Sequence, residues 1–402
     1  MALDLLISHP GNPRIYDMVA ALCRAGFTVR FATGYYYDPN GCESRLPESV
    51  RRRLHRRFHP GLDPSIIVRS LTGEALALGL RRAAVLRDRL TYTWLDRHAA
   101  RLVRKVRPRA VIAAESCALL AFRAAAGVGA ARILDQVIGF EGEGARLMRE
   151  EVARRPELAS TAVIAAESMI ARCRAEALAA DRILAPSAYV RDTLTAIGVD
   201  PARVALVPYG ADTARFSPPA HPRGAHPFRV LFVGQIGARK GVAYLLEGFG
   251  LAALPDSELV LAGPVLGDPA WLERHSGRYR HVAQVPHAEV HRLYQDADIY
   301  VYPSLHEGSS VSILEAMASG LPVVTTPNAG SVIRDGIEGF IVPIRDAAAL
   351  TDRIRRLHGD PVLRARMGAA ARAPALRHDL ARYEADLARE VRAAIATAPG
   401  RR

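Results

Sequence analysis

Apolar runs of strand length alternate with segments of helical period along nearly the whole chain, and this alternation restricts the fold more than any other feature. Strands that are joined through helices pair in parallel, and a parallel sheet is covered by helices on both faces. In the first half, strands are expected at residues 3–8, 28–32, 110–114, 132–135, 182–185 and 204–207. The pattern therefore predicts an α/β, doubly wound fold.

One proline-rich stretch interrupts the alternation. Four prolines fall between residues 218 and 227, as is typical of a linker, and the alternation then resumes. The second half is expected to hold strands at residues 228–233, 258–262, 299–302 and 323–326, and helices at 241–253, 288–295 and 313–319. From residue 346 the chain is helical in period, with Gly359, Pro361 and Pro374 as expected breakers.

The length of 402 residues agrees with two domains, because one hydrophobic core rarely serves so long a chain. We expect an N-terminal domain over residues 1–212, a linker over 213–227, a C-terminal domain over 228–370 and a helical segment over 371–402. Ligands of open α/β sheets bind at the carboxyl ends of the strands. Two such sheets that face each other would place a site in the cleft between them.

Composition excludes several classes of protein. Apolar residues make up 50% of the chain and charged residues 24%, which excludes a disordered or fibrous chain. The first ten residues lack the basic and apolar segments of a secretory signal, so export is not expected. The longest apolar run, 110–122, is interrupted by Glu115 and is shorter than the roughly 20 helical residues that cross a membrane. The four cysteines are scattered, so we expect a cytoplasmic protein without disulfides or zinc.

The net charge of +13 is concentrated in one basic stretch, residues 51–109, which holds sixteen Arg or Lys and four Asp or Glu. Such a surface suits an anionic membrane or an acidic acceptor. The alternative is a solvated helix face in a chain rich in arginine. Nucleic acid is not expected as a partner, because the sequence has no zinc-finger spacing, RNP motif or basic zipper.

The segment that follows the strand at 228–233 has the composition of a phosphate site. It reads Val233-Gly234-Gln235-Ile236-Gly237-Ala238-Arg239-Lys240-Gly241. Gly234 and Gly237 let the backbone approach an anion, the next helix offers free N–H groups, and Arg239 and Lys240 supply charge. The chain has two lysines and fifty-two arginines, so a lysine here indicates a need for a compact point charge. The alternative is a surface turn with two solvated cations.

A second segment, residues 303–322, follows the strand at 299–302 and carries two acids. Glu307 is expected in the loop at the carboxyl edge of the sheet, and Glu315 in the first two turns of the next helix. Carboxylates at these places can accept hydrogen bonds from a ribose diol and from sugar hydroxyls. The alternatives are a capping box of Ser312 with Glu315 and a solvated loop acid at Glu307.

These segments together resemble glycosyltransferase family 4, retaining enzymes of the GT-B fold. The resemblance rests on the Arg-Lys-Gly loop, on the E-x7-E pair with the residues after it, and on Tyr209-Gly210-Ala211-Asp212 with Phe216. Residues 185–187 and 328–340 are also similar to family segments. The resemblance implies two Rossmann-like, doubly wound domains facing a central cleft, with the C-terminal helices returning toward the N-terminal domain.

The resemblance also implies a function. The C-terminal domain would bind a nucleotide sugar, most often a UDP- or GDP-sugar, and the N-terminal domain a hydroxyl acceptor, which could be a glycan, a glycolipid or a small molecule. Lys240 and Arg239 would lie near the phosphates, Glu315 on the ribose and Glu307 on the transferred hexose. The backbone and hydroxyl groups that would line the donor site are those of Gly11, Gly234, Gly237, Ser309 and Ser310.

No cofactor or metal is expected, because cationic side chains can offset the charge that develops on a leaving phosphate. The segment Asp296-Ala297-Asp298 spells the metal motif of a different glycosyltransferase fold, but we expect it to join a helix to a strand. Catalysis would consist mainly of aligning two substrates and holding phosphate charge.

Two positions depart from the family pattern. Gln235 stands where many members have Arg, so another residue must supply that charge. Many members have a His near the reacting centre, and Asp135 is our candidate to replace it in orienting the acceptor. Two other classes stay open: a nucleotide-sugar epimerase or phosphorylase on the same frame, and a non-catalytic protein that binds a nucleotide sugar.

Overall fold

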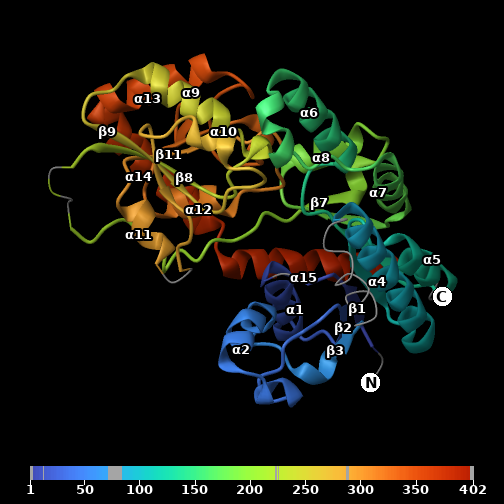
Figure 1. Ribbon diagram of the computed structural model, residues 1–402. Helices are drawn as coiled ribbons and strands as arrows, with labels where there is room; N and C mark the ends of the chain where they lie inside the picture. Colours follow the sequence, from blue (N-terminus) through green and yellow to red (C-terminus); the bar gives the residue numbers. More distant parts are fainter. Residues whose placement is uncertain are drawn as a thin grey trace.

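A computed structural model describes residues 3–11, 13–70, 84–221, 224, 226–286 and 289–398, which form two lobes (Figure 1). Three predicted features lie partly outside the described residues: the basic stretch at 71–83, the linker at 222, 223 and 225, and the helix start at 288. The described part contains no helix that is both long and apolar enough to span a membrane.

The first lobe is built on a seven-stranded parallel sheet in the order β3-β2-β1-β4-β5-β6-β7. The strands are β1 (Leu5–Ser8), β2 (Val29–Thr33), β3 (Ile67–Arg69), β4 (Ala110–Ala114), β5 (Ala131–Asp135), β6 (Arg182–Ala185) and β7 (Val204–Leu206). The helices are α1 (Pro13–Arg24), α2 (Glu48–Leu54), α4 (Ala84–Val106), α5 (Leu119–Gly127), α6 (Glu141–Arg154), α7 (Glu167–Ala179) and α8 (Ala188–Thr195). The central strands β1 and β4 are buried along their whole length, so they consist of apolar and small residues only.

The second lobe repeats this plan with six parallel strands in the order β10-β9-β8-β11-β12-β13. They are β8 (Phe228–Val233), β9 (Ser257–Ala262), β10 (Arg280–Val282), β11 (Ile299–Tyr302), β12 (Val323–Thr325) and β13 (Gly339–Ile341). The helices are α9 (Val242–Ala252), α10 (Ala270–Glu273), α11 (Val290–Gln295), α12 (Val311–Ala318), α13 (Ala347–Gly359), α14 (Pro361–Arg377) and α15 (Leu380–Ala396). The strand order reverses between β8 and β11, and ligands of doubly wound sheets bind at such a point.

The predicted α/β, doubly wound fold is confirmed in both lobes. Strands β4, β6, β8 and β11 have the bounds that the sequence predicted. Three further strands, β3, β10 and β13, were not predicted. Each has three residues and lies at the edge of its sheet, so its signal in the sequence is short.

The last helix, α15, returns to the first lobe, as expected. It lies between the lobes in Figure 1, and its residues Tyr383, Leu387 and Val391 belong to the apolar core on one face of the first sheet. Helix α14 continues through residue 370, where the sequence suggested a boundary, and the chain crosses over at His378 and Asp379. Pro374 lies inside α14 and does not break it, which corrects the expectation for that residue.

Helix α6 belongs to the first lobe in sequence but packs on the second. Leu147 and Met148 are part of the second lobe's apolar core. Glu151 is fully buried, and its carboxylate accepts hydrogen bonds from Tyr244 at 3.1 Å and Arg345 at 2.9 Å. Helices α6 and α15 therefore connect the lobes on two sides of the space between them.

Candidate active site

The glycine-rich segment leaves β8 and brings its two cations against the loop after β11. A 3-10 turn, Ala238–Lys240, is followed by Gly241, which has a left-handed backbone with φ of +67°. A Cβ atom at Gly241 would lie 2.1 Å from the carbonyl oxygen of Pro303, so only glycine allows this approach. The close contact of the two segments places Arg239 and Lys240 beside Glu307.

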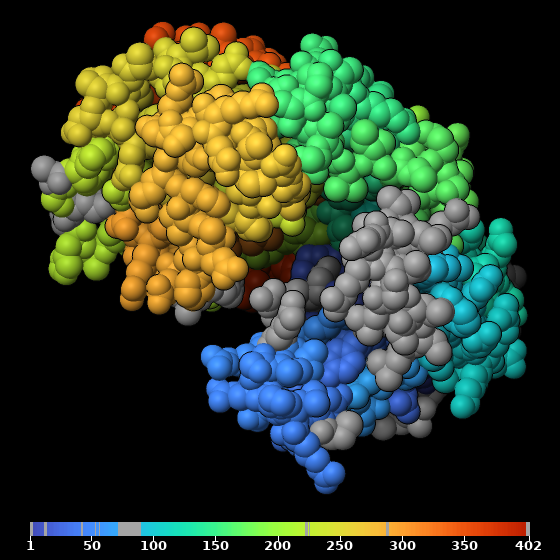
Figure 2. Space-filling view, in the orientation of Figure 1, coloured from blue at the N-terminus to red at the C-terminus, as the bar shows by residue number. Residues whose placement is uncertain are grey.

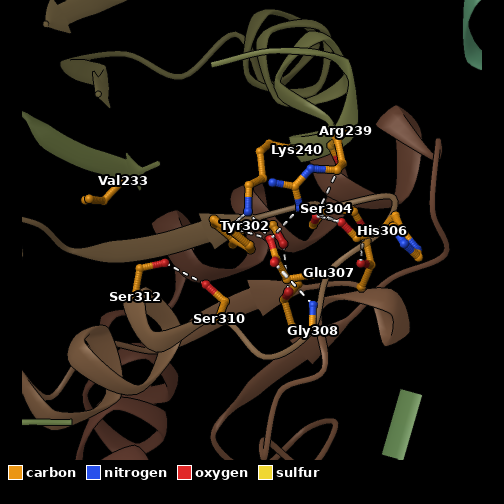
Figure 3. A network of polar contacts seen from close by, with 12 residues as sticks. Val233, Arg239, Lys240, Tyr302, Ser304, His306, Glu307, Gly308, Ser310 and Ser312 are labelled. Atoms are coloured by element: carbon orange, nitrogen blue, oxygen red, sulfur yellow. Dashed lines mark hydrogen bonds and ion pairs between the residues drawn. The ribbon is translucent and has the colours of Figure 1, made fainter. Parts of the chain in front are cut away.

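Lys240 and Arg239 both contact the carboxylate of Glu307 (Figure 3). The Lys240 ammonium forms an ion pair with Glu307 Oε2 and donates to Tyr302 Oη, which in turn donates to Glu307 Oε2 at 3.1 Å. Arg239 Nη1 lies 3.2 Å from Glu307 Oε2 and donates to the His306 carbonyl at 3.0 Å. The side chains of Lys240 and Glu307 are 11% and 13% exposed and pair with each other, so Lys240 is not a solvated cation and Glu307 is not a solvated loop acid.

The buried ammonium depends on its anionic neighbours. Burial, and then the charge of Arg239, hold the pKa of Lys240 well below its ordinary value. Burial also lowers the pKa of Arg239. Glu307 is the carboxylate that offsets these two charges, and the oxygens of a phosphate could take its place.

Glu315 lies on α12, in a setting separate from the Lys240 and Glu307 pair. Its Oε2 accepts a hydrogen bond of 2.7 Å from Tyr294. Burial raises the pKa of Glu315, while Tyr294 and the charge of Arg215 oppose the rise. The capping-box alternative is wrong, because Ser312 lies inside α12 and bonds Tyr300 at 2.6 Å.

The start of α12 lies between the two acids. Ser309 and Ser310 are both buried, at 8% and 6% exposure. Ser310 Oγ is 2.7 Å from Ser312 Oγ, and Figure 3 shows both hydroxyls at the beginning of the helix, below Tyr302. The structure thus brings Glu307, Lys240 and Arg239 into contact. Glu315 lies separately, on α12.

The candidates in the first lobe lie across from this cluster. Gly11 follows β1 with φ of +99°, and its N–H donates to His9 Nδ1 at 2.9 Å. Asp135 ends β5, is 3% exposed, and accepts a hydrogen bond of 2.7 Å from Arg14 Nη2. Asp135 is thus held in an ion pair with Arg14 and shows no contact with Glu307 or Lys240 among the described residues.

A cavity of about 480 Å³ opens between the lobes next to Glu315. It is bounded by α1, the segment 209–216, α12 and α15. The sequence singled out the turn after β1 and the segment that begins at Tyr209, but it assigned no role to Arg14 or Arg215, which line the cavity beside them. Tyr294 and Tyr302, which bond Glu315 and Glu307, were also missed. A tyrosine within a strand or helix is ordinarily interpreted as a core residue.

The remaining predictions concern metal and surface charge. Asp298 accepts the backbone N–H of Arg229 at 2.8 Å and joins α11 to β11, which confirms its predicted structural place. Within the described ranges, no group of three or more His, Cys, Asp or Glu is arranged to hold a metal ion. The end of α4 and the residues after it expose Arg101, Arg104, Lys105, Arg107 and Arg109.

The second lobe is similar in sequence to known proteins. Residues 227–360, which make up most of the second lobe, match the family model "Glycosyl transferases group 1". The phosphatidyl-myo-inositol mannosyltransferase of Mycobacterium leprae is 34% identical over 160 residues, 37% of this chain and 42% of that protein. The D-inositol 3-phosphate glycosyltransferase of Streptomyces avermitilis is 31% identical over 221 residues, 48% of this chain and 47% of that protein. The chain spans about half the length of the curated relatives it matches.

Solved structures resemble the whole chain. The sucrose-phosphate synthase of Thermosynechococcus elongatus superposes with a TM-score of 0.69 at 19% identity, covering 98% of this chain and 100% of that one. The Anabaena protein HepE, solved in complex with UDP-glucose, gives a TM-score of 0.66 at 14% identity with the same coverage. The chain therefore has the two-lobed GT-B fold of glycosyltransferases, and its second lobe matches the group 1 family model.

Proposed function

We propose that the protein is a retaining glycosyltransferase that moves a hexose-type sugar from a nucleotide sugar to a hydroxyl acceptor. The observation that carries the proposal is the buried cluster of Lys240, Arg239 and Glu307. It lies at the carboxyl ends of β8 and β11, where the strand order of the second sheet reverses. Doubly wound sheets bind phosphate-containing ligands at this place.

The donor would extend along the start of α12. Lys240 and Arg239 would contact the diphosphate, together with backbone groups near Gly234, Gly237, Ser309 and Ser310. Glu315, which lines the cavity, would accept hydrogen bonds from the ribose hydroxyls, and Glu307 from the transferred sugar. A UDP- or GDP-sugar is the proposed donor, and the HepE complex with UDP-glucose supports this class.

Catalysis would depend on charge and alignment. The bond between the sugar C1 and the phosphate oxygen breaks, and a bond from C1 to the acceptor oxygen forms on the same face of the ring. The acceptor hydroxyl gives its proton to an oxygen of the leaving phosphate. Lys240 and Arg239 stabilise the negative charge that develops on that phosphate, a role that a metal ion fills in other sites. In this scheme Asp135 acts on the acceptor side through Arg14.

The exposed cations at the end of α4 could attract an acceptor or a membrane that carries negative charge. We propose that the basic stretch 51–109 rests on the anionic cytoplasmic face of a membrane or attracts an acidic acceptor. Cosedimentation with vesicles of anionic lipid that weakens with added salt would support this location. Equal sedimentation with neutral and anionic vesicles would contradict it.

The donor is identified by a thermal-shift panel of UDP-, GDP-, ADP- and dTDP-sugars, because a ligand that binds the native state raises its unfolding temperature. Calorimetry with the selected donor then compares Glu315→Ala with Asp352→Ala, a control that removes an exposed acid on α13. We expect loss of affinity in the first variant only. Equal affinities would contradict the ribose role, and conversion of the donor into an isomer without an acceptor would indicate an epimerase.

A further inference from the structure

The cavity of about 480 Å³ between the lobes is lined by donors of hydrogen bonds that lack partners. Figure 2 shows the hollow between the orange atoms of the second lobe and the blue atoms of the first, with dark red atoms of α15 at its floor. Arg14 enters the cavity from α1, and Arg215 from the segment that leads to the second lobe. Both arginines thus line one space.

Arg14 uses only part of its hydrogen-bonding capacity. Its Nη2 donates to Asp135 at 2.7 Å, and its Cζ lies 5.0 Å from the centre of the Tyr209 ring. Its Nη1 is buried and has no hydrogen-bond partner among the residues that the structure describes. Burial opposes the charge of Arg14, but Asp135 and the nearby tyrosines raise its pKa, so the group stays cationic.

Arg215 also has a nitrogen that is not used in hydrogen bonding to described residues. Its Cζ lies 5.6 Å from the centre of the Phe216 ring. Its Nη2 is buried and has no partner within the described part of the chain. The hydroxyl of Tyr209, which lines the same cavity, is also buried without a described partner, whereas the buried Tyr383 hydroxyl interacts with Arg14. The free groups of Arg14, Arg215 and Tyr209 can each donate a hydrogen bond.

Among the described residues, the four acids that line the cavity bond to other groups, and one of them, Asp17, lies 3.1 Å from His59 Nε2. Glu384 is bonded to Arg24 at 2.5 Å, and Asp212 accepts the backbone N–H of Arg215 at 3.1 Å. Glu315 is bonded to Tyr294, and burial raises its pKa, which favours its neutral form. Buried donors without acceptors are costly, so the presence of several of them in one cavity points to a ligand with several acceptor oxygens.

We propose that this cavity binds an anionic group of a substrate, a phosphate or a carboxylate, through Arg14 and Arg215. The proposal rests on the proposed function, because only a glycosyltransferase would make this anionic ligand a donor or acceptor substrate. Two sources share this chemistry: the diphosphate of the donor and an acidic group on the acceptor.

The test is calorimetric titration of inorganic phosphate into the full chain, with and without saturating UDP or GDP. Phosphate should bind the wild-type protein, and its Kd should rise at least tenfold in Arg14→Gln and in Arg215→Gln, since each removes a charge-assisted hydrogen bond. Arg24→Gln is the matched control, because it removes the same charge at the cavity rim from an arginine already paired with Glu384. Its Kd should change less than about twofold.

Arg14→Gln leaves Asp135 without its cation, so its fold must be checked by circular dichroism. Arg215→Gln breaks no ion pair with a described residue, and it decides the proposal if Arg14→Gln is unfolded. Competition between nucleotide and phosphate would assign the anion to the donor. Phosphate binding that persists under saturating nucleotide, with the same dependence on arginine, would assign it to the acceptor.

Equal phosphate affinity in the wild type and both variants would overturn the proposal, as would a wild-type protein that does not bind phosphate at millimolar concentration. Failure of the proposed function looks different. In that case no nucleoside diphosphate or nucleotide sugar binds, whereas phosphate binding keeps its dependence on Arg14 and Arg215.

Discussion

Replacing Gly308 with alanine should disturb both the contact between the lobes and the position of Glu307. An ideal Cβ atom at Gly308 would lie 1.8 Å from the carbonyl oxygen of Val137 in the first lobe. The two backbones would have to separate by about 1.6 Å to reach an ordinary contact of 3.4 Å. The Gly308 carbonyl also accepts a bond of 2.5 Å from Ser187, so the loop is held from both sides.

We expect Gly308→Ala to lower the free energy of unfolding by about 2 kcal/mol or more, as overpacking between backbones does. For lobes of this size, that corresponds to a fall of about 4–8 °C in the unfolding midpoint. A shift of about 1 Å at Glu307 should lower turnover by about 10²-fold. Backbone strain does not contribute, because Gly308 is not in the left-handed region.

Thermal unfolding and transfer kinetics measure the two effects. Gly359→Ala is the control, because its added Cβ would meet no atom within 4 Å and alanine is no less stable than glycine in a helix, so it should lower neither quantity. A Gly308→Ala protein with the wild-type midpoint and wild-type turnover would refute the reasoning. Loss of stability with full turnover would separate the contact between the lobes from the placement of Glu307.

Three further outcomes are expected. Lys240→Ala should lower turnover by about 10²-fold, because a desolvated cation on the leaving phosphate is lost, and an unchanged kcat would contradict that role. In Tyr294→Phe the pKa of Glu315 should rise further, since the lost hydrogen bond favoured the carboxylate. As the pH is lowered, nucleotide binding should then begin to weaken at a higher pH than in the wild type. Identical pH profiles of the two proteins would contradict a role of Glu315 in nucleotide binding. Burial and the charge of Arg239 lower the pKa of His306 to about 4 from an ordinary 6.5, so the unfolded chain binds a proton that the folded chain does not. The contribution of His306 to stability is therefore fully present above pH 6.5, and about 3 kcal/mol of it is lost as the pH drops toward about 4. In urea titrations at several pH values, His306→Gln should reduce the dependence of the unfolding free energy on pH, whereas His221→Gln, at an exposed residue, should not.

The order of strands and helices was predictable because the buried strands are continuous apolar runs. Strands β8 and β11 show this most clearly, since both have the predicted bounds. The edge strands β3, β10 and β13 gave a weaker signal, because each has only three residues. Pro374 misled the prediction because it lies in the last turns of α14, where its carbonyl accepts from His378 at 2.9 Å and little helix remains to be broken.

The candidate site was predictable as two loops at one edge of a sheet, but the pairing within it was not. Sequence spacing placed Glu307 and Lys240 at the carboxyl ends of β8 and β11. It could not tell that Lys240 pairs with Glu307 while Tyr294 holds Glu315, because these choices depend on how loops and helices distant in the sequence pack together. The role of Arg14 depends on how two lobes face each other, and no local pattern carries that information.

The central claim is that Lys240, Glu307 and Glu315 surround one nucleotide sugar between the lobes. It is tested most directly by a crystal structure of the protein with the nucleotide sugar that the thermal-shift panel selects. The account predicts that the diphosphate contacts the Lys240 ammonium, that the ribose hydroxyls reach Glu315, and that the sugar lies against Glu307. A donor bound away from these three side chains, or a protein that binds none of the nucleotide sugars, would contradict it.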